Sequence, residues 1–151
     1  MTDSTANPEP DRFNLARFLD AQDGVYPTAL AELRSGRKRT HWMWFIFPQL
    51  DGLGSSSMAR RFAIRDINEA SAYLAHSILG RQLLECCRVL LALPTTSATD
   101  ILGYPDDLKL RSSMTLFALV AENKPEFDAV LAKFFGGHTD ANTLALLQSR
   151  H

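Results

Sequence analysis

Residues 40–49 are the part of the chain best suited to contact a ligand. This segment contains both tryptophans, Trp42 and Trp44, two of the nine phenylalanines, a histidine and a Pro-Gln end. Ligand pockets are mostly apolar with a few well-placed polar groups, which is the composition seen here. As a pocket wall, the segment would stack Trp42 or Trp44 on a ring of the ligand and use His41 and Gln49 as polar contacts.

A structural role for the same segment is the competing interpretation. Large rings that carry polar atoms are costly to bury unless those atoms have partners. In this interpretation Trp42, Phe45 and Phe47 are buried in the core, and His41 forms a hydrogen bond with a nearby carbonyl. The sequence leaves both interpretations open.

Residues 106–111 supply a second set of charged side chains suited to ligand chemistry. Asp106 and Asp107 stand in the first turn of a predicted helix, where carboxylates favour the helix dipole. Asp107 and Arg111 also have the i,i+4 spacing of a surface ion pair. Alternatively, the group faces the aromatic segment as a polar cluster. Arg111, beside Lys109, would then hold a phosphate or carboxylate, and an aspartate would orient a ring or act as a general base.

Basic residues gather on both sides of the aromatic segment. The first group is Arg34, Arg37, Lys38 and Arg39, and the second is Arg60, Arg61 and Arg65. Each group is typical of a solvated helix end, with local attraction of an anion as the alternative. The chain shows no strip of basic residues with exposed aromatics between them, so the sequence does not predict a nucleic-acid partner.

Together these residues predict a binding protein or enzyme for a small anionic ligand with a ring, such as a nucleotide-like metabolite. The predicted ligand-binding residues are His41, Trp42, Trp44, Gln49, Asp106, Asp107, Lys109 and Arg111. No metal or cofactor is predicted, because the histidines and cysteines lack metal-ligand spacing, and catalysis stays an open question. The alternative is a helical protein-interaction module without chemistry. A concave site favours the ligand, whereas a flat apolar patch favours the protein partner.

Length and composition predict one globular domain. The 151 residues are 46% hydrophobic and 22% charged, with a formal net charge of -1. A chain of this length and hydrophobic content can form one core. Its small net charge gives no overall electrostatic field that attracts nucleic acid or membranes. The oligomeric state stays open. No apolar run of about 18 residues is present, and residues 1–10 lack the features of a signal peptide, so a cytosolic location without membrane contact is expected. The adjacent Cys86 and Cys87 are expected to be reduced core residues.

Hydrophobic spacing predicts helices along most of the chain, most clearly over residues 78–93. Within this range the apolar positions repeat at steps of four and three: Leu79, Leu83, Cys86, Leu90 and Leu93. Ser97, Asp100 and Gly103 predict a capped turn. Further helices are expected to begin near Asp11, Pro27, Ser57, Asn68, Tyr104, Asn123 and Thr139.

The predicted fold is therefore all-α. It is a compact single domain over residues 11–151, with about seven or eight helices, preceded by a flexible tail over residues 1–10. The helices differ in length, which distinguishes the arrangement from a simple four-helix bundle. The region from 37 to 54 is irregular because Pro48, Gly52 and Gly54 prevent a long helix. Its run 42–47 is either a buried strand-like stretch or a short helical turn.

Three stretches form long motifs: residues 41–49 (HWMWFIFPQ), 79–81 (LGR) and 105–117 (PDDLKLRSSMTLF). In these motifs the chain resembles the domain of unknown function 1810 family, and the resemblance extends from about Phe13 to Leu147. Members of that family are small, single-domain and mainly helical, which implies the same fold class here. The resemblance implies no activity and no catalytic residues.

Overall fold

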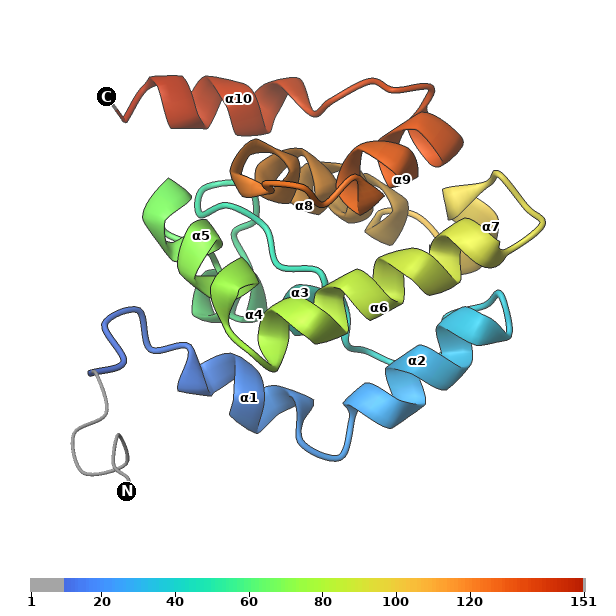
Figure 1. Ribbon diagram of the computed structural model, residues 1–151, viewed down its shortest axis with the longest axis horizontal. Coiled ribbons are helices and arrows are strands. Elements are labelled where there is room, and N and C mark those ends of the chain that lie inside the picture. Colours follow the sequence, from blue (N-terminus) through green and yellow to red (C-terminus); the bar gives the residue numbers. More distant parts are fainter. Residues whose placement is uncertain (1–9, 151) are drawn as a thin grey trace.

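The structure, a computed structural model, describes residues 10–150 of the chain. The flexible tail predicted for residues 1–10 lies outside these residues except for Pro10. Within the described range the chain forms ten helices and one isolated parallel bridge between Leu50 and Ile64 (Figure 1). The helices are α1 (Ala16–Gln22), α2 (Tyr26–Arg34), α3 (Met43–Ile46), α4 (Ser57–Arg61), α5 (Ile67–Ala75), α6 (Leu79–Ala92), α7 (Ala98–Leu102), α8 (Asp106–Val120), α9 (Glu126–Phe135) and α10 (Ala141–Gln148).

The all-α prediction is confirmed, and the helices are more numerous than the predicted seven or eight. Two short elements explain the difference. The aromatic segment folds as the four-residue helix α3, and the capped turn after Ser97 is the five-residue helix α7. No helix within residues 10–150 is both long and apolar enough to span a membrane.

Helix α8 is the centre of the domain. It packs against α5, α7, α9 and α10, so neighbours surround it on several sides. Leu110, Met114 and Phe117 are fully buried, and the whole run 112–117 is buried with them. Consecutive residues of a helix point in different directions, so α8 is buried on more than one face.

Helix α6 matches its prediction closely. Leu79, Leu83 and Leu90 are buried, as are both cysteines, which are free thiols. Burial raises the pKa of the Cys86 thiol to about 12, which keeps it protonated at neutral pH.

Gly80 explains why the short LGR motif contains glycine. A Cβ atom at this position would stand 1.9 Å from the carbonyl oxygen of Leu74, at the end of α5. The backbones of α5 and α6 therefore approach so closely that only glycine fits.

Several helix ends follow the predicted capping residues, and two do not. Ser97 accepts a hydrogen bond from the Asp100 N–H, as expected, and Gly103 ends that helix. Asp140, and not the predicted Thr139, caps α10, because its carboxylate accepts the Thr143 N–H. The first helix begins at Ala16 and not at Asp11, although the Asp11 carboxylate still accepts the N–H groups of Leu15 and Ala16.

Candidate functional site

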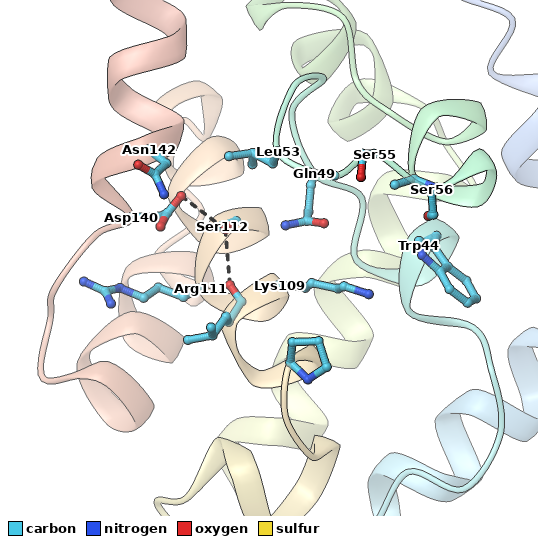
Figure 2. A pocket seen from close by; sticks show the side chains of 14 residues that line it. Trp44, Gln49, Leu53, Ser55, Ser56, Lys109, Arg111, Ser112, Asp140 and Asn142 are labelled. Carbon is cyan, nitrogen blue, oxygen red and sulfur yellow. Dashed lines mark hydrogen bonds between the residues drawn. The ribbon is translucent and has the colours of Figure 1, made fainter.

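An open groove of about 590 Å³ lies between the segment from α3 to α4 on one side and the starts of α8 and α10 on the other (Figure 2). Both sets of residues that the sequence marked for ligand chemistry contribute to it. Its lining residues are Trp44, Gln49, Leu53, Gly54, Ser55, Ser56, Ala59, Pro105, Leu108, Lys109, Arg111, Ser112, Asp140 and Asn142.

The α3 side of the groove presents an indole ring and an amide. Met43, Phe45 and Ile46 anchor this single helical turn in the core, and Trp44 is the one residue of α3 left partly exposed. After the turn, the Gln49 carbonyl accepts the Ile64 N–H at 2.8 Å, which holds the loop against the segment after α4. With its backbone held in this way, the Gln49 amide projects into the groove (Figure 2).

The α8 side of the groove presents a lysine. The Lys109 ammonium points toward Trp44 and lies 5.2 Å from the centre of its ring, within the range of a cation–π interaction (Figure 2). Its carboxylate partner is Asp106, at 3.3 Å, and Asp106 also binds Lys38 at 2.9 Å. One carboxylate thus serves two ammonium groups, which leaves a local excess of positive charge at this wall.

Arg111 lines the groove, but its guanidinium is turned toward the loop between α9 and α10 (Figure 2). It donates to the carbonyl oxygens of His138 at 3.1 Å and Thr139 at 2.7 Å. The predicted ion pair between Asp107 and Arg111 does not form: none of the ion pairs among residues 10–150 contains either residue. In this position Arg111 fixes the loop that brings α10 to the groove.

The two aspartates considered as general bases do not line the groove. Asp107 is buried and accepts hydrogen bonds from the Thr99 hydroxyl at 2.6 Å and from the adjacent Leu108 N–H at 2.8 Å. Asp106 is engaged by the two lysines described above. The carboxylate that does line the groove is Asp140, which accepts hydrogen bonds from Ser112 and from the Thr143 hydroxyl. Its position is set by capping α10, so the groove offers no carboxylate dedicated to proton transfer.

Trp42 and His41 are also placed away from the groove. Trp42 has an exposed fraction of 0%, and its indole N–H donates to Glu32 at 2.9 Å. Stacking of a ligand on Trp42 is therefore ruled out in this structure, and the core interpretation holds for Trp42, Phe45 and Phe47. His41 is exposed and does not line the groove, and within residues 10–150 the predicted hydrogen bond to a carbonyl does not form.

Glu32 is a buried acid whose role the sequence did not reveal. Its carboxylate accepts four hydrogen bonds: from the N–H groups of Arg39 and Thr40, from the Thr40 hydroxyl and from the Trp42 indole. Burial acts to raise the pKa of Glu32, but these hydrogen bonds outweigh it and lower the pKa to about 2. Glu32 therefore stays ionised and ties α2 to the start of the aromatic segment.

Ten of the fourteen residues that line the groove are not among the predicted ligand-binding residues. The loop and N-terminal turn of α4 contribute Leu53, Ser55 and Ser56, while the start of α10 contributes Asp140 and Asn142. The sequence predicts a helix start near Ser57, and Ser56 caps α4 by accepting the Ala59 N–H. For the start of α10 no local signal exists, because its place in the groove depends on packing against α8.

Comparisons with known proteins agree with this architecture. The family described as "Protein of unknown function (DUF1810)" matches residues 12–147, most of the chain. The chain belongs to this family. Among solved structures, it is similar to the conserved hypothetical protein Rv1873 from Mycobacterium tuberculosis, determined at 1.38 Å, with 52% identity, a TM-score of 0.89, and coverage of 91% of this chain and 99% of that one. A comparison with curated proteins found no match.

Proposed function

We propose that the groove binds a small ligand that combines a planar ring with an anionic group, as nucleotide-like metabolites do. The observation that carries the proposal is the meeting of Trp44, Gln49 and Lys109 across one concave space of about 590 Å³. Trp44 and Gln49 lie in residues 41–49 and Lys109 lies in residues 105–117, the two segments from which the sequence predicts ligand contacts. A concave site favours a small ligand over a flat protein partner.

Each of the three side chains suits a different part of such a ligand. The partly exposed Trp44 ring offers a surface for stacking, and the Gln49 amide can both donate to and accept from a polar ring edge. The Lys109 ammonium would bind the anionic group, since Asp106 is shared with Lys38 and neutralises it only in part. Ser55 and Ser56 add hydroxyl groups on the same side as Gln49 (Figure 2).

The proposal is for binding and not for a particular reaction. Asp106 and Asp107, the predicted bases, are engaged elsewhere, and Asp140 is held as a helix cap. Buried free thiols at Cys86 and Cys87 suit a reducing compartment, so we place this function in the cytosol.

The test uses the two indole N–H signals of ¹⁵N-labelled protein, which report Trp42 and Trp44 separately. Nucleoside monophosphates are added one at a time, with the parent nucleosides as uncharged controls. We expect the Trp44 signal to shift with a saturable dependence and the buried Trp42 signal to stay in place. A Trp44→Phe variant assigns the two signals.

Matched substitutions then separate binding from folding. Lys109→Gln should weaken binding by about tenfold, the effect of losing one charge-assisted hydrogen bond. Lys124→Gln is the control, because Lys124 lies in the loop between α8 and α9, does not line the groove, and makes only a 3.5 Å contact with the Glu122 carbonyl. Equal affinities of the two variants, or a shift of both indoles, would contradict the proposal.

A protein partner at the same groove is the second candidate function. Leu108, which lines the groove, is 47% exposed, and Tyr104, next to the lining residue Pro105, is 77% exposed. If the nucleotides do not bind and a Tyr104→Ser, Leu108→Ser double variant changes the set of proteins that co-purify with the chain, this interaction role replaces the small-ligand proposal.

A further inference from the structure

A second hollow of about 280 Å³ has walls dominated by arginine, and we call it the arginine hollow. Its lining residues are Asn14, Arg17, Asp51, Arg60, Arg61, Ala63 and Arg65. None of them lines the groove, although both spaces use the loop before α4 and α4 itself. The arginine hollow is therefore a separate place on the molecule.

Arg17 is the structural base of this hollow. Its side chain is only 12% exposed, and Glu69 neutralises it through an ion pair of 2.7 Å. Its remaining N–H groups donate to four backbone carbonyls, those of Phe13, Asn14, Arg61 and Ala63. Arg17 thus fixes the backbone at Arg61 and Ala63. All of its N–H groups are used in these contacts, so it has no free donor for a ligand.

Nearby carboxylates do not fully compensate the positive charges of the other three arginines of the lining. Arg65 lies 3.7 Å from Glu69, but that carboxylate is already paired with Arg17. Within residues 10–150, no carboxylate lies within 4 Å of the guanidinium of Arg60 or Arg61. The Arg60 guanidinium donates to the Ser55 carbonyl, and the Arg61 guanidinium lies 5.1 Å from the centre of the Phe62 ring. The lining residues Arg60, Arg61 and Arg65 carry three positive charges against the one negative charge of Asp51, an excess of two. The whole chain has a formal net charge of -1, so this excess is a local feature.

Asp51 is the one carboxylate among the lining residues of the hollow, and it forms no ion pair within residues 10–150. Its backbone carbonyl accepts a hydrogen bond from Arg150, which does not itself line the hollow. Asp51 therefore provides a means to raise the positive charge of the hollow by mutation, because Asp51→Asn leaves that backbone contact in place.

We propose that the arginine hollow binds the dianionic phosphate group of a small phosphomonoester. Guanidinium groups bind phosphate through paired N–H donors, and a phosphomonoester carries about -1.5 to -2 charges at neutral pH, which matches the excess in the hollow. The size of the hollow suits one phosphate with a sugar-sized group. A nucleic acid requires an extended basic surface, which a hollow of this size does not supply.

The binding test uses ribose 5-phosphate and inorganic phosphate as probes at pH 7.5. Ribose and sodium chloride at matched ionic strength are the controls. The readout is the set of arginine Nε–H signals and backbone amide signals of ¹⁵N-labelled protein. We expect saturable shifts at Arg60, Arg61 and Arg65 with both phosphates and none with ribose. Equal shifts with sodium chloride would show general screening and overturn the proposal.

Three variants test the same site in opposite directions. Arg65→Gln should weaken ribose 5-phosphate binding by about tenfold, the effect of one charge-assisted hydrogen bond. Arg34→Gln is its matched control and should change affinity less than twofold, because both side chains are 61% exposed and have a carboxylate at 3.7–3.8 Å. Asp51→Asn should tighten binding several-fold by removing a like charge, a gain that damage to the fold cannot produce.

The outcomes of these variants decide the proposal. Similar affinities for Arg65→Gln and Arg34→Gln, or no gain with Asp51→Asn, would refute it. Displacement of ribose 5-phosphate by an oligonucleotide without terminal phosphate, at lower concentration than by inorganic phosphate, would replace it with a polyanion surface. Because the groove variants and the hollow variants affect different residues, failure of one proposal leaves the other intact.

Discussion

Trp42 and Trp44 stand two residues apart in one segment and have opposite surroundings. Trp42 is fully buried and bonded to the buried carboxylate of Glu32, whereas Trp44 is partly exposed and faces Lys109 across the groove. Trp42 is the residue before α3 and has a non-helical backbone, whereas Trp44 lies within the single turn of α3 and is its one residue left partly exposed. The core interpretation therefore describes Trp42, and the pocket-wall interpretation describes Trp44.

The largest expected effect is on the free energy of unfolding, which should fall much more when Trp42 is removed than when Trp44 is removed. Trp42→Ala should reduce the free energy of unfolding by about 3–5 kcal/mol, because it removes a large buried side chain and leaves a cavity. Trp44→Ala should reduce it by about 1 kcal/mol, since that ring is partly solvated already. Urea denaturation followed by circular dichroism measures both. Equal losses would mean that the segment is one uniform core element.

The next effect concerns the acid that holds Trp42. Glu32→Ala leaves the buried Trp42 indole N–H without its acceptor and removes the acceptor of three further donors, so we expect a loss of about 3 kcal/mol. The exposed Glu122 is the control, and Glu122→Ala should change stability by less than about 0.5 kcal/mol. A small loss at Glu32 would show that water replaces the carboxylate easily.

A pH dependence follows from the same carboxylate. The pKa of Glu32 is about 2 in the folded protein against 4.5 for an unperturbed glutamate, so the unfolded state binds the proton first as the pH falls. Its stabilising contribution is therefore complete above pH 4.5 and is lost between pH 4.5 and about pH 2. The stability difference between wild type and Glu32→Gln should shrink across that window. A difference that stays constant down to pH 2.5 would contradict the lowered pKa.

The smallest effect is spectroscopic. Acrylamide should quench the fluorescence of Trp44, and a Trp44→Phe variant should retain only the shielded emission of Trp42. That variant should change the free energy of unfolding by less than about 1 kcal/mol, because phenylalanine keeps most of the apolar contact. Strong quenching of the remaining tryptophan would show that Trp42 is not sealed in the core.

The sequence predicted a helix correctly where its position depends on a local pattern, such as the spacing of leucines or a capping residue at its end. The leucine spacing of α6 places its buried face correctly, and Ser97 and Gly103 mark the two ends of α7. The prediction for α10 was off by one residue at its cap, because Thr139 and Asp140 are both good caps and only the packed structure selects between them. For α3, a run of large apolar residues does not distinguish a strand from a helical turn.

The groove was predictable in part. Trp44, Gln49, Lys109 and Arg111 all line it, as the sequence suggested, although the guanidinium of Arg111 is used by the carbonyls of His138 and Thr139. Trp42, Asp106 and Asp107 lie elsewhere because they have other partners, and His41 is exposed outside the groove. Trp42 is buried and donates to Glu32, Asp107 is buried and accepts from the Thr99 hydroxyl, and Asp106 pairs with two lysines.

By itself the sequence determined the all-α class, most helix positions and the two segments that meet at the groove, since all of these depend on spacing and on end-capping residues close along the chain. Only the tertiary structure decided which tryptophan is buried, which charges are paired and where the free guanidinium groups gather. Those outcomes depend on partners distant in sequence: Lys38 reaches Asp106, and Arg17 reaches Glu69. A side chain's charge state and exposure are set by the atoms around it, and no local pattern records them.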